Sequence, residues 1–140
     1  MSESNLSEYE LTGTRISPKR TTIDTGEATF EIGREVNPVE YFLGSVLGCL
    51  NSTATMVARD MDIDIDDLEL AVEGAVNYGR YRGEETDDRA GLQGLEVTLS
   101  VAADADEAEL EAWLAAVEDR CPVTDNVENA TGVDVALDVR

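Results

Sequence analysis

The stretch that decides the fold is residues 37–60, NPVEYFLGSVLGCLNSTATMVARD. Its first residues are typical of a helix start, because Asn37 supplies an N-cap, Pro38 suits the first helical position, and Glu40 completes a capping box. From Tyr41 to Ala58 no residue is charged, although 29% of the chain is. An ordinary surface helix has one solvated face, so we expect this helix to be central and largely buried.

The predicted helix has two distinct faces. Its apolar face repeats at a spacing of three and four residues and comprises Val39, Phe42, Leu43, Val46, Leu47, Leu50, Ala54 and Val57. Its other face is small and weakly polar and comprises Ser45, Gly48, Cys49 and Ser52. Small residues allow a ligand or another backbone to approach closely. A membrane span is the rival interpretation, but the polar residues from Asn51 to Thr55 and the acidic flanks argue against it.

Alternation of apolar and polar residues predicts strands on both sides of this helix. Residues 9–32 read as a small antiparallel meander, with turn signals at Ser17-Pro18 and Thr25-Gly26. Residues 68–78 and residues 95–101 alternate as two further strands, with a charged excursion between them. This excursion covers residues 79–91.

A second helix should follow the last of these strands. Asp104 and Glu107 resemble a second capping box and predict its start, and it should end near Cys121. Its predicted buried residues are Leu110, Leu114 and Val117. The alternation of Val133, Val135, Leu137 and Val139 then predicts a closing strand. This order favours an α+β fold over alternating βαβ units, and 140 residues suffice for a single domain spanning residues 1–140.

Composition limits the partners of the chain. The formal charge of -21 repels phosphate backbones and anionic lipid surfaces, so neither nucleic acid nor a membrane is an expected partner. Only Lys19 among the ten basic residues is a lysine, and this excess of arginine in an acidic chain resembles proteins from salt-loving archaea. Residues 1–9 lack the basic and apolar segments of a secretory signal, so we expect a cytoplasmic protein.

The two cysteines are the candidate reactive groups. A reducing cytoplasm disfavours a permanent disulfide, which leaves buried thiols, a metal site or redox chemistry. The chain has no histidine, so neither a Cys-His catalytic pair nor an ordinary zinc site is expected, and we predict no metal and no cofactor. Cys49, on an apolar helix, is more often a packing residue. Cys121 precedes Pro122 and is either a loop cysteine without a role or the N-cap of a short helix, whose N–H groups favour a thiolate.

A thiol that attacks a peroxide must be a thiolate, so a cation is needed nearby. Arg15, Arg20 and Arg34 all precede the central helix and are the candidates. Taken singly, each is more often a solvated surface charge.

With both cysteines placed, the sequence resembles the OsmC/Ohr family of osmotically inducible and organic-hydroperoxide-resistance proteins. Residues 37–49, NPVEYFLGSVLGC, resemble the family's helix entry and its reactive cysteine. Residues 121–126, CPVTDN, resemble its Cys-Pro-Val-Ser-Asn stretch, and residues 17–21, SPKRT, lie upstream as expected. The resemblance extends from about Tyr9 to Val139 and is specific because the motifs occur together and in this order.

The resemblance implies antiparallel sheets packed around a long central helix in an intertwined homodimer. It implies a two-cysteine thiol peroxidase that reduces organic hydroperoxides. Cys49 corresponds to the peroxidatic cysteine, which becomes a sulfenic acid, and Cys121 to the resolving cysteine, which condenses with it to a disulfide that an external dithiol reduces. Arg20 best matches the arginine that stabilises the thiolate.

One position departs from the family pattern. Hydroperoxide-specialised members usually have Glu directly after Asn-Pro, whereas here Val39 takes that place and Glu40 follows. Glu40 is therefore either a catalytic partner of the arginine or only the closing residue of the capping box. Two other functions stay open, namely a binding module for a small apolar ligand and a redox sensor without significant peroxidase turnover.

Overall fold

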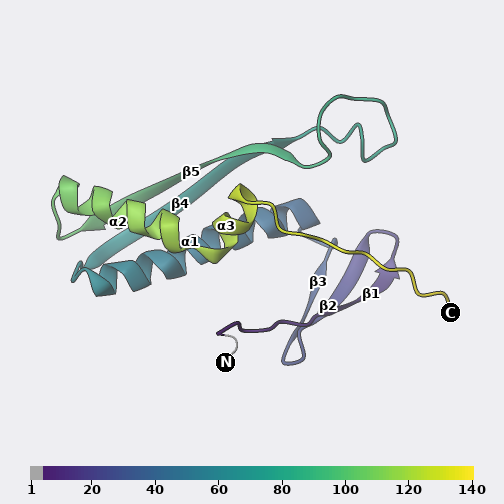
Figure 1. The fold of residues 1–140 in the computed structure, drawn as a ribbon, viewed down its shortest axis with the longest axis horizontal. Helices are drawn as coiled ribbons and strands as arrows, with labels where there is room; N and C mark the ends of the chain where they lie inside the picture. Colours follow the sequence, from purple (N-terminus) through teal and green to yellow (C-terminus); the bar gives the residue numbers. More distant parts are fainter. Residues whose placement is uncertain (1–4) are drawn as a thin grey trace. The chain divides into compact units, whose positions relative to one another are not determined.

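A computed structural model describes residues 5–140, and Figure 1 shows its fold. The elements in chain order are β1 (Thr12–Ser17), β2 (Arg20–Asp24), β3 (Thr29–Ile32), α1 (Pro38–Asp60), β4 (Ile65–Val76), β5 (Leu92–Ala103), α2 (Glu107–Arg120) and α3 (Pro122–Glu128). The predicted α+β class is confirmed. Residues 1–4, on which the expectation of no secretory signal partly rests, lie outside the described residues.

The chain divides into two compact units, residues 1–44 and residues 45–140, with the boundary inside α1. The first unit contains the predicted antiparallel meander, in the order β1-β2-β3. The predicted helix start is confirmed, because Asn37 Oδ1 accepts the Glu40 N–H at 2.8 Å and Glu40 Oε1 accepts the Asn37 N–H at 3.0 Å. Tyr41 joins the first turn of α1 to β3, since its hydroxyl donates to the Glu31 carbonyl at 3.0 Å. A single chain-wide domain stays a prediction.

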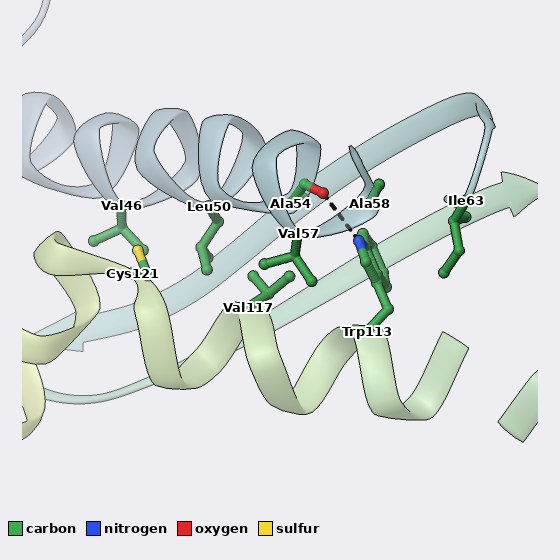
Figure 2. Packing of buried hydrophobic residues seen from close by; sticks show 9 residues of the cluster. All are labelled: Val46, Leu50, Ala54, Val57, Ala58, Ile63, Trp113, Val117 and Cys121. Atoms are coloured by element: carbon green, nitrogen blue, oxygen red, sulfur yellow. Dashed lines mark hydrogen bonds between the residues drawn. The ribbon is translucent and has the colours of Figure 1, made fainter. Parts of the chain in front are cut away.

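The second unit is built on a long antiparallel hairpin of β4 and β5, which run side by side in Figure 1. Cross-strand pairs such as Leu70 with Leu99 and Val72 with Val97 place apolar side chains on one face. Helices α1 and α2 supply most of the fully buried core residues, which are Val46, Leu50, Ala54, Val57, Ala58, Ile63, Trp113, Val117 and Cys121 (Figure 2). The Trp113 indole N–H donates to the Ala54 carbonyl at 3.0 Å and so ties α2 to α1.

The expectation that α1 is largely buried is wrong for this single chain. Only one face of the helix packs into the core, and its buried residues are Val46, Leu50, Thr53, Ala54, Val57 and Ala58. Gly48, Ser52 and Met56, with Met56 50% exposed, lie outside that core. By length and composition α1 is also long and apolar enough to cross a membrane, which is weak evidence because core helices of soluble proteins pass the same test.

The start and the buried face of α2 differ from the prediction. The capping box is made by Asp106 and Glu109 rather than Asp104 and Glu107. The reason is that β5 continues to Ala103, and the Asp104 N–H donates to the carbonyl of Asp64, just before β4. The buried residues of α2 are Trp113 and Val117. Leu114, predicted to be buried, is 39% exposed, since the helix turns its tryptophan toward α1 instead.

The predicted closing strand is not formed. Residues 130–140 contain no regular element, and Val133, Val135, Leu137 and Val139 are each at least 79% exposed. An isolated segment cannot form a strand without a partner edge to accept its hydrogen bonds. The alternation is therefore present in the sequence, but the single chain offers this segment no partner strand.

Candidate redox site

Cys121 is positioned by a sharp corner between two helices. Proline lacks a backbone N–H and disfavours a helical conformation in the residue before it, so Pro122 ends α2 at Arg120. Cys121 adopts an extended conformation, with φ -82° and ψ 114°, and is both the C-cap of α2 and the N-cap of α3. The predicted short helix after Cys121 is confirmed. The corner places Cys121 in the core, where it is only 1% exposed and belongs to the same buried cluster as Val46 (Figure 2).

The structure brings the two cysteines together. Cys49 is carried by α1 and Cys121 by the corner between α2 and α3, and their side chains approach to 3.4 Å as free thiols. Cys49 is partly exposed, whereas Cys121 is buried. A dithiol at this separation can be oxidised to a disulfide with little backbone movement. Of the two thiols, only Cys49 is open to a reagent from solution.

The surroundings of Cys121 favour its thiolate. Burial is the strongest single influence and opposes ionisation, but the nearby Thr124 hydroxyl, the backbone N–H groups of Thr124 and Val123, and the Cys49 thiol together lower its pKa. The N–H groups belong to the first turn of α3, as expected for a thiol at an N-cap. The Thr124 hydroxyl has one proton, which it donates to the Cys121 carbonyl at 3.3 Å in this conformation, and it can turn to the sulfur when Cys121 ionises.

The surroundings of Cys49 have the opposite effect. Burial raises its pKa most, the Val123 N–H partly offsets this, and the neighbouring Cys121 raises it further. Removal of one proton from the pair therefore leaves the negative charge on Cys121, with the Cys49 thiol as its hydrogen-bond donor. The partly exposed Cys49 therefore needs a nearby cation before it can act as the nucleophile.

The predicted arginines all lie in the first unit. Arg20 is the first residue of β2, and its Nε donates to Glu31 Oε2 at 2.7 Å. This pairing raises the pKa of Arg20 and lowers the pKa of Glu31. The positive charge of Arg34 lowers the pKa of Glu31 slightly further. Arg15 is exposed on β1. The structure therefore gives Arg20 a carboxylate partner, and its action on Cys49 stays a prediction.

Glu40 is accounted for by the capping box, in which its Oε1 accepts the Asn37 N–H. A catalytic role for Glu40 also stays a prediction. The residue at the site that was not predicted from the sequence is Thr124, which lies in the quoted CPVTDN stretch and lowers the pKa of Cys121. Its place in the sequence could have predicted this contact. Thr124 is the third residue of a helix whose N-cap is Cys121, and an N-cap side chain faces the third residue of its helix. Within residues 5–140, no three acidic or cysteine side chains gather closely enough to hold a metal ion.

Comparison with known proteins identifies a family and a fold. The profile of the family described as OsmC-like protein matches residues 31–136. An OsmC-like protein from Mycoplasma pneumoniae is similar in structure, with a TM-score of 0.77, 18% identity and 89% of each chain covered. No curated protein matches the sequence.

Two further solved structures have related names. The organic hydroperoxide resistance protein OsmC of Legionella pneumophila has a TM-score of 0.62 and 17% identity, covering 89% of this chain and 91% of its own. The organic hydroperoxide resistance protein OhrB of Bacillus subtilis has a TM-score of 0.55 and 21% identity, covering 88% and 93%. At these identities the likeness shows a shared fold. An origin in a salt-loving archaeon stays a prediction.

Proposed function

The chain belongs to the OsmC-like family, and from this premise we propose that it is a thiol-dependent peroxidase that reduces organic hydroperoxides through Cys49 and Cys121. The observation that carries the proposal is the approach of a partly exposed thiol to a buried thiol at 3.4 Å. Relatives of the same fold that are named for organic hydroperoxide resistance support the choice of substrate class.

The reaction has three balanced steps. The Cys49 thiolate attacks the outer oxygen of the hydroperoxide, the O–O bond breaks, and with one proton the products are a Cys49 sulfenic acid and an alcohol. The Cys121 sulfur then attacks the Cys49 sulfur, which forms the disulfide and releases water. An external dithiol reduces the disulfide and is itself oxidised. In the second step the lowered pKa of Cys121 is an advantage, because the attacking sulfur is the one that ionises more easily.

The first step needs a positive charge near Cys49, and we assign this role to Arg20. Cys49 alone has a raised pKa, so a guanidinium is required to lower it. Arg20 is supported by its conformation, because its ion pair with Glu31 holds the side chain in one direction. Arg15 and Arg34 are the alternatives, and Glu40 could assist only by leaving its cap.

A homodimer is part of this proposal. From Tyr41 to Ala58 the open face of α1 contains no charged residue in a chain with a charge of -21, which is unusual for a surface that stays in water. The exposed, alternating segment of residues 133–139 also needs a partner strand. A second copy of the chain could cover both. The cytoplasm is the expected location, since its reducing conditions keep both thiols available.

The direct test is consumption of an alkyl hydroperoxide in the presence of a small dithiol. The Cys49→Ser variant should lose turnover. Without the dithiol, Cys121→Ser should still consume about one equivalent and accumulate a sulfenic acid that a sulfenic-acid reagent traps. Thr55→Ala, at an exposed position further along α1 where the hydroxyl donates to the Asn51 carbonyl, is the control and should be fully active. Undiminished turnover by Cys49→Ser would contradict the proposal.

A redox sensor is the second candidate, because the raised pKa of Cys49 favours slow reaction with peroxide. For a sensor, the disulfide should form and be reduced reversibly while steady-state turnover stays near the uncatalysed rate.

A further inference from the structure

The second unit contains a cavity of about 340 Å³ between α1, β5, α2 and α3. Its walls are mainly apolar and include Val46 and Leu50 of α1 and Leu95, Val97 and Leu99 of β5. The volume lies at the lower end of the range of small-molecule sites in proteins, and the mixture of apolar walls with few polar groups is typical of them. The cavity is therefore large enough for a small organic molecule.

The cavity shares its wall with the thiol pair. Val46 lines the cavity and belongs to the same buried cluster as Cys121 (Figure 2). Leu50, also in the wall, directly follows Cys49 on α1. Thr124 lines the cavity as well, and its hydroxyl donates to the Cys121 carbonyl at 3.3 Å. Neither cysteine lines the cavity, which reaches the thiol pair through two wall residues: Val46, one turn before Cys49 on α1, and Thr124, which contacts Cys121.

The charged groups of the cavity have one sign. Glu118 of α2 and Glu128 of α3 are in its lining, and among the described residues that line it none is basic. Both carboxylates are exposed, so they lie where a ligand enters from water. A carboxylate on the ligand would meet two like charges next to an apolar wall, with no cation to pair with. A neutral ligand meets no such electrostatic repulsion at this entrance.

We propose that this cavity binds the apolar body of a neutral organic hydroperoxide and rejects hydroperoxides that carry a carboxylate, with Glu118 and Glu128 as the residues that set this selection. The choice of a hydroperoxide rests on the proposed function, whereas the preference for neutral over anionic apolar molecules rests on the cavity alone. The selection therefore has one test by turnover and one by binding.

The turnover test compares cumene hydroperoxide bearing a para carboxylate with its methyl ester. The two substrates share the reacting O–O bond and the aromatic body. The wild-type protein should show a kcat/KM at least about tenfold higher for the ester. In the double variant Glu118→Gln with Glu128→Gln, the ratio of ester to acid should fall severalfold.

The matched control removes the same charge elsewhere. Glu73 and Glu96 are a cross-strand pair on the opposite, exposed face of the β4-β5 hairpin, so Glu73→Gln with Glu96→Gln also removes two negative charges. This variant should keep the wild-type ratio. An equal fall in both double variants would mean that the net charge of the chain, and not the cavity, selects the substrate, and would overturn the proposal.

The binding test uses two fluorescent probes with one skeleton, neutral N-phenyl-1-naphthylamine and anionic 8-anilino-1-naphthalenesulfonate. The neutral probe should bind the wild-type protein at least about tenfold more tightly. The variant lacking Glu118 and Glu128 should gain affinity for the sulfonate severalfold while its thermal melting stays cooperative. If this pattern holds but no hydroperoxide is consumed, the proposed function fails and the selective cavity stands. If neither probe binds, as when a second copy fills the cavity, or if both bind equally, the cavity proposal fails whatever the turnover.

Discussion

Oxidation of the thiol pair should stabilise the fold by a large and calculable amount. A bond between Cys49 and Cys121 closes a loop of roughly 70 residues, which removes about 4 kcal/mol of chain entropy, at room temperature, from the unfolded state. Because the cysteines already lie 3.4 Å apart, the folded state needs only a small adjustment to form the bond. With an unfolding entropy of about 2.1 cal/mol/K per residue, the midpoint of thermal unfolding should rise on the order of 10–15 °C.

Thermal unfolding followed by circular dichroism measures this shift. Reduced protein is compared with protein oxidised by one equivalent of hydroperoxide, and mass spectrometry verifies the loss of two hydrogen atoms. A non-reducing gel checks that the bond lies within one chain. The Cys121→Ser variant, treated in the same way, is the control and should show no rise.

Two results would refute the reasoning. An unchanged or lower midpoint, with the bond verified within one chain, would mean that the disulfide distorts the native core as much as it restricts the unfolded chain. A bond found only between chains would mean that Cys49 and Cys121 of one chain are not native neighbours.

Four further predictions concern the core, the first unit and the thiols. Replacing Trp113 by Phe removes the indole hydrogen bond and part of the packing against α1, and urea unfolding should show a loss of about 2–3 kcal/mol. Gly33→Ala should destabilise the meander strongly, because Gly33 has φ +102° and an added Cβ would overlap the Lys19 carbonyl; Gly26→Ala, at φ +94° with open space around it, should cost only about 1 kcal/mol in the same urea assay. In thiolate absorbance titrations, Cys49→Ser should ionise at lower pH than Cys121→Ser, and a reversed order would contradict the assignment. The pKa of Cys121 is lower in the folded state than in the unfolded state, so its ionisation should stabilise the fold above the unfolded-state pKa. This stabilisation should be lost as the pH falls through the folded-state pKa, and urea unfolding of Cys49→Ser across this pH range measures the loss.

The features predicted correctly from the sequence are those that local chemistry decides. The start of α1 follows from the Asn37, Pro38 and Glu40 side chains acting on their own backbone. The corner at Cys121 follows from the missing N–H and fixed ring of Pro122. The strands follow from alternation, since a half-buried strand turns every second side chain to the core.

The features predicted wrongly depend on what each element packs against. The buried face of α2 includes Trp113 because its indole N–H reaches the Ala54 carbonyl, a contact between residues far apart in sequence. The alternating residues 133–139 remain exposed because a strand needs a partner that this chain does not offer them. Neither the contact of Trp113 nor the missing partner strand can be predicted from a pattern of neighbouring residues.

The thiol site divides in the same way. The sequence by itself determined that two cysteines, without histidine, are the only strong nucleophiles, and that Cys121 is an N-cap whose helix favours a thiolate. The tertiary structure alone decided that Cys49 lies 3.4 Å from Cys121, that Cys121 is the buried member, and that the pKa values of the two thiols move in opposite directions. The physical reason is that distance and desolvation arise only when α1 packs against the corner between α2 and α3, whereas the hydrogen-bonding capacity of a cap is a property of a few consecutive residues.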